Sequence, residues 1–466
     1  MTRDAFEVGR LDATDQAALV ATGEVKATEL VEWAIERAEA LNPQLNAIVI
    51  PMYDYARDGS GGVPMVLKDL VVEVPGIGFT EGSRFLEGLV SEFESELVAR
   101  YRRAGYVFIG KTNTPEFGMA PSCEPALYGP TRNPWNLERT TGGSTGGSAA
   151  AVAAGIVPVG HGSDAGGSIR YPASCCGLFG LKPTRARNPL GPEYGEALGG
   201  AAVEHALTRS VRDSAAALDA TSGPAPGDRY WAPPPTRPFR DEVGANVGRL
   251  RVAYCRASAE NTELHPDCLA ALDETLVLLD GLGHDLTEEP FTPIDEKTGA
   301  AIGTLMTGAT AWILAYWERR LGRSAGPDDL EESTLAMADA GKSVTAAEWL
   351  LAADDINAYT RRAAGWFDDY DLFLSPTVTT PPPTLAEIKT NPGEMIRNAG
   401  VVANLTGNPA MSVPLFWNGD LLPIGSHFLA PFGDEATLLR LAAQLEAAQP
   451  WADRWPPVSV AAGELA

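Results

Sequence analysis

Two glycine-flanked serines, Ser144 and Ser168, lie in a segment rich in small residues, residues 139–184. A serine hydroxyl becomes a nucleophile when a neighbouring base accepts its proton, so this segment is a candidate for nucleophilic catalysis. None of the five histidines lies in a sequence setting that marks it as that base. The sequence therefore leaves two questions: which serine reacts, and which group activates it.

The residues that lead into Ser168 favour an oxyanion hole. Successive amides with little side chain can turn their N–H groups toward one point and stabilise the oxyanion of a tetrahedral intermediate. The residues of this predicted oxyanion hole are Ala165, Gly166, Gly167 and Ser168. Asp164 and Arg170 flank the turn, and we expect them to form an ion pair that holds the loop without touching substrate.

Ser144 admits other interpretations. The stretch from Gly142 to Gly146 matches the pattern G-x-S-x-G of a nucleophile elbow, but an elbow follows a hydrophobic strand and this one follows the polar stretch NPWNLERTT. A phosphate-binding loop is a weaker alternative, because the Walker lysine is absent. A third interpretation is structural: the stretch GGSAAAVAAG would pack as a helix against a sheet.

Lys68 is the best candidate for the base. It lies inside the apolar, strand-like stretch VPMVLKDLVV, where an unpaired ammonium is costly unless its pKa falls. A lysine that loses its proton near neutral pH can serve as a general base. Asp69 follows it on a strand and would point to the opposite face, so it need not pair with Lys68. The alternative is that Lys68 ends the strand and extends its ammonium to water.

The elements that must position these residues alternate between helical and strand-like patterns, which predicts an α/β fold. GVPMVLKDLVV, YVFIG, LRVAYC and DLFLSPT are typical of short strands. Residues 28–41 have helical periodicity, and Asn42-Pro43 predicts the end of that helix. We expect one compact domain over residues 1–466.

The composition excludes several functions. A formal net charge of −25 argues against nucleic-acid binding, which requires concentrated Lys and Arg. The five cysteines and five histidines form no metal-ligand pattern, so we expect no metal and packed, reduced thiols. No export signal and no apolar run of ~20 residues stand out, so we expect a soluble, cytoplasmic protein without membrane partners.

Several motifs together resemble the amidase signature family of serine hydrolases. They are GVPMVLKDL, GKTNTPEFG, GGSTGGSAAAVAAG, GSDAGGSIRYPAS and GLKPT. Further stretches, such as GPTRNPWNLERT and PGDRYWAPP, are similar to the branch of 6-aminohexanoate-cyclic-dimer hydrolases. The resemblance implies one large domain with a central mixed β-sheet covered by helices on both faces. Residues 60–225 would hold the catalytic core and residues 290–367 a mainly helical insertion that shapes the substrate site.

The resemblance also implies roles for the three candidate residues. Ser168 would be the acylated nucleophile, Ser144 a proton relay joined to Gly143 by a cis peptide bond, and Lys68 the ultimate base and acid. No cofactor is implied. Thr145 stands where the family usually has a serine, and we expect its hydroxyl to support the loop. Ser163 and Ala165 also differ from the residues that the family usually has at these positions. The oxyanion would need only the backbone of residue 165, so the chemistry should survive this difference.

The substrate is less well defined by the sequence. We expect a small linear or cyclic amide such as an aminohexanoate oligomer, with specificity set by loops such as residues 187–200 and by the helices of residues 302–367. Candidate pocket residues are Met119, Cys123, Trp312 and Trp317. Alternatives are an aryl acylamidase, a general aliphatic or aromatic amidase, an amidotransferase subunit with partner subunits, or a binding protein without activity. Likeness to the family also suggests a homodimer.

Overall fold

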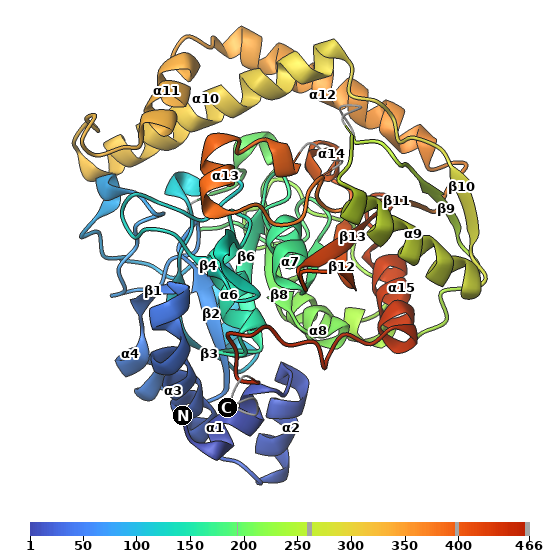
Figure 1. The fold of residues 1–466 in the computed structure, drawn as a ribbon. Coiled ribbons are helices and arrows are strands. Elements are labelled where there is room, and N and C mark those ends of the chain that lie inside the picture. Colours follow the sequence, from blue (N-terminus) through green and yellow to red (C-terminus); the bar gives the residue numbers. More distant parts are fainter. Residues whose placement is uncertain (193, 259–262, 397–399, 462–466) are drawn as a thin grey trace.

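A single mixed sheet organises the molecule (Figure 1). The computed structural model describes residues 1–192, 194–258, 263–396 and 400–461. The strands of the main sheet follow the order β1-β3-β2-β6-β8-β7-β12-β13-β11-β9-β10, and β4 pairs with β5 separately. Parallel pairs such as β2 with β3 stand beside antiparallel pairs such as β6 with β8. The predicted α/β class with a mixed sheet is confirmed.

The strands, in chain order, are β1 (Ile48–Pro51), β2 (Val63–Lys68), β3 (Tyr106–Thr112), β4 (Arg132–Asn133), β5 (Asn136–Thr140), β6 (Val159–Asp164), β7 (Phe179–Lys182), β8 (Val203–Thr208), β9 (Arg251–Tyr254), β10 (Asp285–Glu288), β11 (Leu372–Pro376), β12 (Ala410–Trp417) and β13 (Pro423–Leu429). The α-helices are α1 (Arg3–Gly9), α2 (Ala13–Thr22), α3 (Ala27–Leu45), α4 (Tyr53–Arg57), α5 (Glu96–Arg103), α6 (Gly146–Ala153), α7 (Arg170–Cys176), α8 (Val211–Thr221), α9 (Pro266–Gly281), α10 (Glu296–Leu321), α11 (Glu332–Gly341), α12 (Ala346–Trp366), α13 (Leu385–Thr390), α14 (Gly400–Thr406) and α15 (Glu435–Ala448). Short 3₁₀ turns lie at Arg84–Leu86, Glu116–Gly118, Leu198–Gly200, Phe239–Glu242 and Glu394–Ile396.

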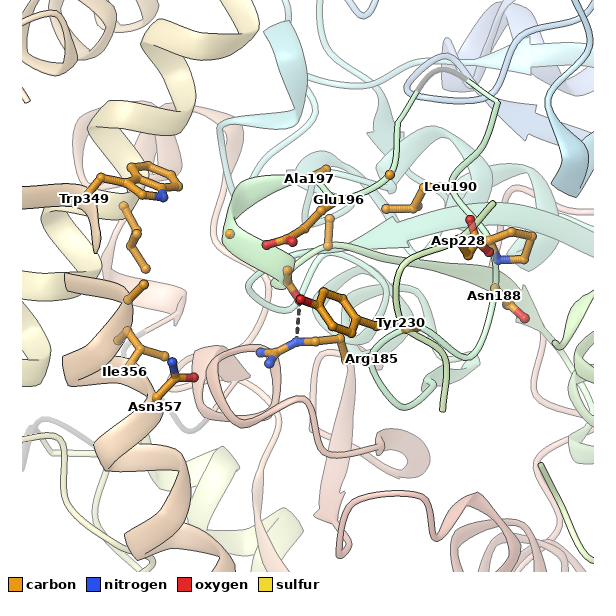
Figure 2. Close-up of a pocket in the computed structure, with 18 residues that line it drawn as sticks. Arg185, Asn188, Leu190, Glu196, Ala197, Asp228, Tyr230, Trp349, Ile356 and Asn357 are labelled. Atoms are coloured by element: carbon orange, nitrogen blue, oxygen red, sulfur yellow. Dashed lines mark hydrogen bonds between the residues drawn. The ribbon is translucent and has the colours of Figure 1, made fainter. Parts of the chain in front are cut away.

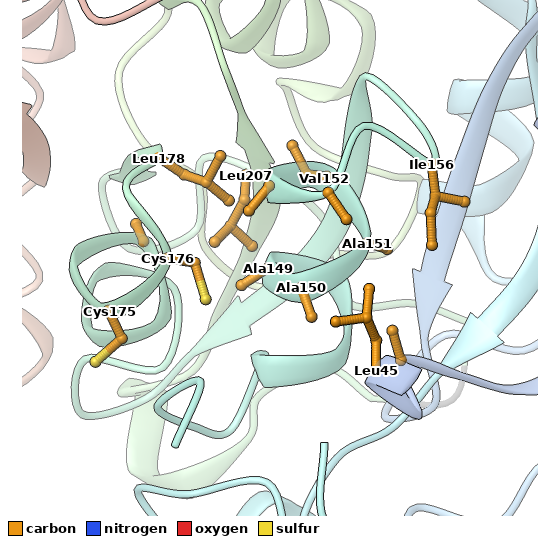
Figure 3. Close-up of a cluster of buried hydrophobic side chains, with 14 of the residues drawn as sticks. Leu45, Ala149, Ala150, Ala151, Val152, Ile156, Cys175, Cys176, Leu178 and Leu207 are labelled. Carbon is orange, nitrogen blue, oxygen red and sulfur yellow. The ribbon is translucent and has the colours of Figure 1, made fainter. Parts of the chain in front are cut away.

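Helices cover the sheet on both sides. On one side, α3, α6 and α7 bury alanine, leucine and cysteine side chains in a cluster that includes Ala149, Val152 and Cys175 (Figure 3). On the other side, α8 and α15 pack on alternate residues of β7 and β12, such as Leu181 and Met411. This alternation is the period-two pattern of strands buried on both faces.

Small residues let α6 lie close to the sheet. A Cβ added at Gly160 of β6 would lie 3.0 Å from Val152, and one added at Gly147 would lie 2.6 Å from the backbone of Asn113. Every residue of α6 is buried. The predicted packing helix is therefore present, and its N-terminus begins just after Ser144.

The helices α10, α11 and α12 form an arch over one end of the sheet (Figure 1). They lie within residues 290–367, which the sequence analysis expected to be helical. Of the described helices, α10 alone has the length and hydropathy to cross a membrane, with 28% of its most apolar window buried. The sequence did not predict a possible membrane span here, because glycine, alanine and threonine dilute the apolar pattern of that stretch.

Helix α3 differs at both ends from the helix predicted over residues 28–41. It begins at Ala27, because the Lys26 amide donates to the Glu29 carboxylate (2.8 Å), which is one of the two hydrogen bonds of a capping box. It also continues through Pro43 to Leu45. Asn42 explains this extension, since its side-chain oxygen accepts hydrogen bonds from the amides of residues 47 and 48 and secures the end of the helix.

Candidate active site

Lys68 is the last residue of β2 and is fully buried. Its side chain leaves the sheet on the same face as Val66, toward α6. Its Nζ lies 2.7 Å from Ser144 Oγ, 2.7 Å from Ser163 Oγ and 3.1 Å from Thr145 Oγ1. The ammonium therefore does not reach water, and the alternative of a lysine that extends into solvent is contradicted.

Burial lowers the pKa of Lys68 to about 8, because desolvation penalises the charged form. The carboxyl groups of Glu204, Asp164 and Glu81 act against this and raise the pKa, but the loss of hydration dominates. Asp69 pairs instead with Lys111 at 2.8 Å. Lys68 thus supplies an amine that releases its proton close to neutral pH.

A buried histidine and a buried glutamate lie behind Lys68. The backbone amide of Lys68 donates to His161 Nδ1 at 3.3 Å, and His161 Nε2 lies 2.8 Å from Glu204 Oε2. Burial lowers the pKa of His161 to about 3, so the imidazole is neutral at pH 7, and burial raises the pKa of Glu204 well above its usual value. His161 therefore holds the backbone of the base and contacts neither serine hydroxyl.

Ser144 lies in the turn between β5 and α6, and the peptide bond that joins it to Gly143 is cis. A Cβ added at Gly143 would lie 2.7 Å from the backbone of Ser122, so only glycine fits there. Thr145 links this turn to the second serine, because its amide donates to the Ser168 carbonyl at 3.2 Å. Its hydroxyl donates to the Ser163 carbonyl (3.1 Å), which is a loop-supporting contact of the kind expected for Thr145.

Asp164 organises the turn that carries Ser168. Its carboxylate forms a buried ion pair with Arg170 (2.9 Å) and accepts hydrogen bonds from the amides of Gly167 (2.8 Å) and Ile169 (3.0 Å). The Arg170 pair is placed as the sequence analysis expected. Asn404 of α14 donates to the same carboxylate at 2.9 Å.

The predicted oxyanion hole needs one correction. The Gly167 amide is already bound to Asp164, so it is not available to an oxyanion. Within the described part of the chain, the amides of Ala165, Gly166 and Ser168 have no protein acceptor. These three donors remain for a substrate carbonyl.

Ser144 and Ser168 open into a common cavity of about 60 Å³. Its other walls are Leu70, Val71, Glu81, Phe117, Gly118, Ser163, Ala165, Tyr194, Ala197, Leu198, Ala202, Glu204, Trp312, Ile313 and Tyr316. Several wall residues other than glycine have left-handed backbones, namely Val71 (φ 66°), Glu81 (φ 49°), Phe117 (φ 50°) and Leu198 (φ 52°). Such backbones cost about 1–3 kcal/mol each and persist only where the surrounding structure holds them in place.

One of the four predicted pocket residues lines the cavity, and the other three do not. Trp312 lines the cavity. Trp317 does not, because it is buried in the core and its indole donates to Glu81 (2.9 Å). Cys123 is buried next to Thr131, and Met119 packs against the core cluster of Trp317. These three residues are therefore corrected from pocket to core.

Glu81, Tyr194 and Tyr316 of the cavity wall were not predicted from the sequence. Tyr316 follows Trp312 by one helical turn in α10, so the helical spacing of that stretch carried a signal for it. Glu81 and Tyr194 lie in loops, where periodicity gives no signal. Nor do the described residues contain a cluster of His, Cys, Asp or Glu that could hold a metal ion.

A second, wider cavity of about 430 Å³ adjoins the first, with Ala197 and Ala202 in both walls. Figure 2 shows Trp349, Ile356 and Asn357 of α12 on one side of it. Glu196, Asp228 and Arg185 lie across the cavity, and the Arg185 Nε donates to the Gly200 carbonyl. The cavity of Ser144 and Ser168 therefore lies beside a wider and more polar cavity, here called the outer chamber.

Known proteins resemble this chain over nearly its whole length. A family model described as "Amidase" matches residues 29–439. The chain is 38% identical to a 6-aminohexanoate-cyclic-dimer hydrolase of Paenarthrobacter ureafaciens, over 96% of each chain. A solved structure of 6-aminohexanoate cyclic dimer hydrolase superposes with a TM-score of 0.92 at 37% identity, covering 97% of this chain and 99% of the other. A bacterial aryl acylamidase structure superposes with a TM-score of 0.87 at 25% identity, covering 95% and 97%.

Proposed function

The chain belongs to the amidase family and is an amide hydrolase, and from that premise we propose that it cleaves small linear or cyclic amides through an acyl-enzyme on Ser168. Aminohexanoate oligomers are the proposed substrates, because the relative from Paenarthrobacter ureafaciens is named for the cyclic dimer. One observation carries the proposed chemistry: the desolvated Lys68 amine lies 2.7 Å from Ser144 Oγ, in a cavity that Ser168 shares.

The proposed first half-reaction moves one proton along three side chains. Neutral Lys68 accepts the proton of Ser144 while Ser144 accepts that of Ser168, and Ser168 Oγ attacks the amide carbonyl. The oxyanion accepts hydrogen bonds from the free amides at residues 165, 166 and 168. The proton then returns through Ser144 to the amide nitrogen, the carbon–nitrogen bond breaks, and the amine leaves.

The proposed second half-reaction reverses the roles. Water gives a proton to the same relay and attacks the Ser168 ester, which releases the carboxylic acid and restores the Ser168 hydroxyl. The neighbouring outer chamber gives the amine a route out and water a route in. Ser163 would steady the Lys68 amine throughout, since its hydroxyl lies 2.7 Å from Nζ.

A panel of amides tests this proposal. We expect the purified chain to hydrolyse the cyclic and linear aminohexanoate dimers unaided, and Ser168→Ala and Lys68→Ala to lose at least 10³-fold in kcat/KM. A fluorophosphonate should label Ser168, with peptide mass spectrometry as the readout. Activity retained in Ser168→Ala but lost in Ser144→Ala would contradict the assignment and return the nucleophile to the elbow at Ser144.

The same panel discriminates the alternatives. An aryl acylamidase would prefer an anilide, which is the alternative that the second solved structure and the aromatic cavity wall support. An amidotransferase subunit would hydrolyse glutamine only with partner subunits. A protein without activity would not react with the fluorophosphonate.

A further inference from the structure

Glu81 is a buried carboxylate in the wall of the catalytic cavity. It shares that wall with Ser144 and Ser168 and is 3% exposed. Its Oε1 accepts a hydrogen bond from the Val71 amide (3.3 Å) and its Oε2 accepts one from the Trp317 indole (2.9 Å). A carboxylate oxygen has two lone pairs, so each oxygen can accept one more donor.

Glu81 differs from the other carboxylates around it. Asp69 pairs with Lys111 at 2.8 Å, and Glu73 pairs with Arg320 at 2.6 Å. No such pair is formed by Glu81 with any lysine or arginine that the structure describes. Burial, together with the charges of Asp69 and Glu73, raises the pKa of Glu81 to about 7, although the hydrogen bonds from Val71 and Trp317 act to lower it. An ionised carboxylate in this position is costly until a cation arrives.

Three aromatic rings line the same cavity. The ring centroids of Tyr194 lie 6.0 Å from Trp312 and 5.3 Å from Tyr316, and those of Trp312 and Tyr316 are 6.1 Å apart. Grouped aromatic faces attract organic cations, because the ring quadrupole presents negative charge at its face. Leu70 and Ile313 add apolar surface suited to methylene groups.

We propose that Glu81, with Tyr194, Trp312 and Tyr316, binds the ammonium group at the end of a linear substrate's acyl chain, so that ω-amino amides are preferred among linear substrates. This inference rests on the proposed function, in which Ser168 attacks the amide at another point of the cavity. Trp317 is a positioning residue here, since its indole holds the carboxylate without lining the cavity.

The cavity has a size that suits such a chain. Its volume of about 60 Å³ is much smaller than the roughly 430 Å³ of the outer chamber, so it suits a slender, unbranched chain. The leaving group can extend into the adjoining outer chamber instead. The narrow cavity is therefore assigned to the acyl part, and the outer chamber accepts leaving groups of varied size.

The test compares two amides of equal length. In 6-aminohexanamide an ammonium stands where heptanamide has a methyl group, and at pH 8 the amine is charged and Glu81 is mostly ionised. We expect the wild type to favour 6-aminohexanamide by at least tenfold in kcat/KM, and Glu81→Gln to lower that ratio at least tenfold. Shorter and longer ω-amino amides should react less well, because the carboxylate is fixed.

The control variant is Glu87→Gln, which removes the same charge from an exposed residue of the same loop and should leave the ratio unchanged. Thermal melting shows whether each variant is folded. An equal fall of the ratio in both variants, or no preference in the wild type, would overturn the proposal.

A binding measurement separates this proposal from the proposed function. Calorimetry measures the affinity for hexylammonium and for 1-hexanol, and it requires no turnover. Tighter binding of the cation, lost in Glu81→Gln, together with no hydrolysis of any amide would refute the proposed function and support the ammonium site. Hydrolysis of both amides with equal affinity for the two probes would support the proposed function and refute the ammonium site.

Discussion

The pH dependence of amide hydrolysis should follow the titration of Lys68. With its pKa lowered to about 8 by burial, roughly one molecule in ten has a neutral Lys68 at pH 7 and roughly nine in ten at pH 9. The value of kcat/KM should therefore rise about tenfold over this interval and reach a plateau. A lysine with its ordinary pKa of 10.5 would instead give a rise of about 100-fold with no plateau.

The assay measures kcat/KM for heptanamide from pH 6 to 10, with melting temperatures to exclude unfolding. An uncharged substrate is used because Glu81 also titrates in the cavity, with a pKa of about 7. Any inflection that Glu81 causes should disappear in Glu81→Gln, whereas the plateau above pH 9 should persist. A unit slope that continues to pH 10, or a flat profile between pH 7 and 9, would refute the assignment of Lys68 as the base.

Four further predictions concern stability and geometry. Between pH 8 and 10.5 the unfolded chain binds more protons at Lys68 than the folded one, so stability should rise with pH there, by up to about 3 kcal/mol relative to Lys68→Met in urea unfolding. Asp164→Asn should cost about 3–5 kcal/mol in the same assay, because it leaves Arg170 buried without its anion; an unchanged midpoint would contradict this. Gly162→Ala places a Cβ 2.5 Å from Thr145 and should cost about 1–3 kcal/mol together with activity, whereas Gly281→Ala, with no atom within 4 Å, should be tolerated. Ser163→Ala removes a 2.7 Å partner of Lys68 Nζ and should lower kcat and shift the pH profile, and Ser163→Thr should restore both; a profile unchanged in Ser163→Ala would exclude this role.

The residues of the proposed proton relay were largely predictable from the sequence as candidates, because each is unusual in its setting. Lys68 stands out as a charge inside an apolar strand, and Ser144 and Ser168 stand out through their glycines. The family resemblance added the roles of the two serines. Asp164 and Arg170 were predicted as a pair from their positions on either side of one turn.

The cavity wall was less predictable, because it is assembled from separate loops and one helix face. Trp312 and Trp317 lie in the same helix, and only the rotation of α10 decides that Trp312 lines the cavity and Trp317 enters the core. The Gly167 amide was assigned to the oxyanion because sequence cannot reveal that a side chain already binds it. Glu81 gave no signal, since a single glutamate in a loop is usually a solvated charge.

The order of strands in the sheet has a consequence for biosynthesis. The last two strands, β12 and β13, lie between β7 and β11, so the ribosome must make more than four hundred residues before the two parts of the sheet can join. Until then the edges of β7 and β11 are unpaired, and exposed strand edges promote aggregation. A nascent or prematurely terminated chain should therefore depend on molecular chaperones. A reporter fused to the C-terminus should monitor whether the two parts of the sheet have joined.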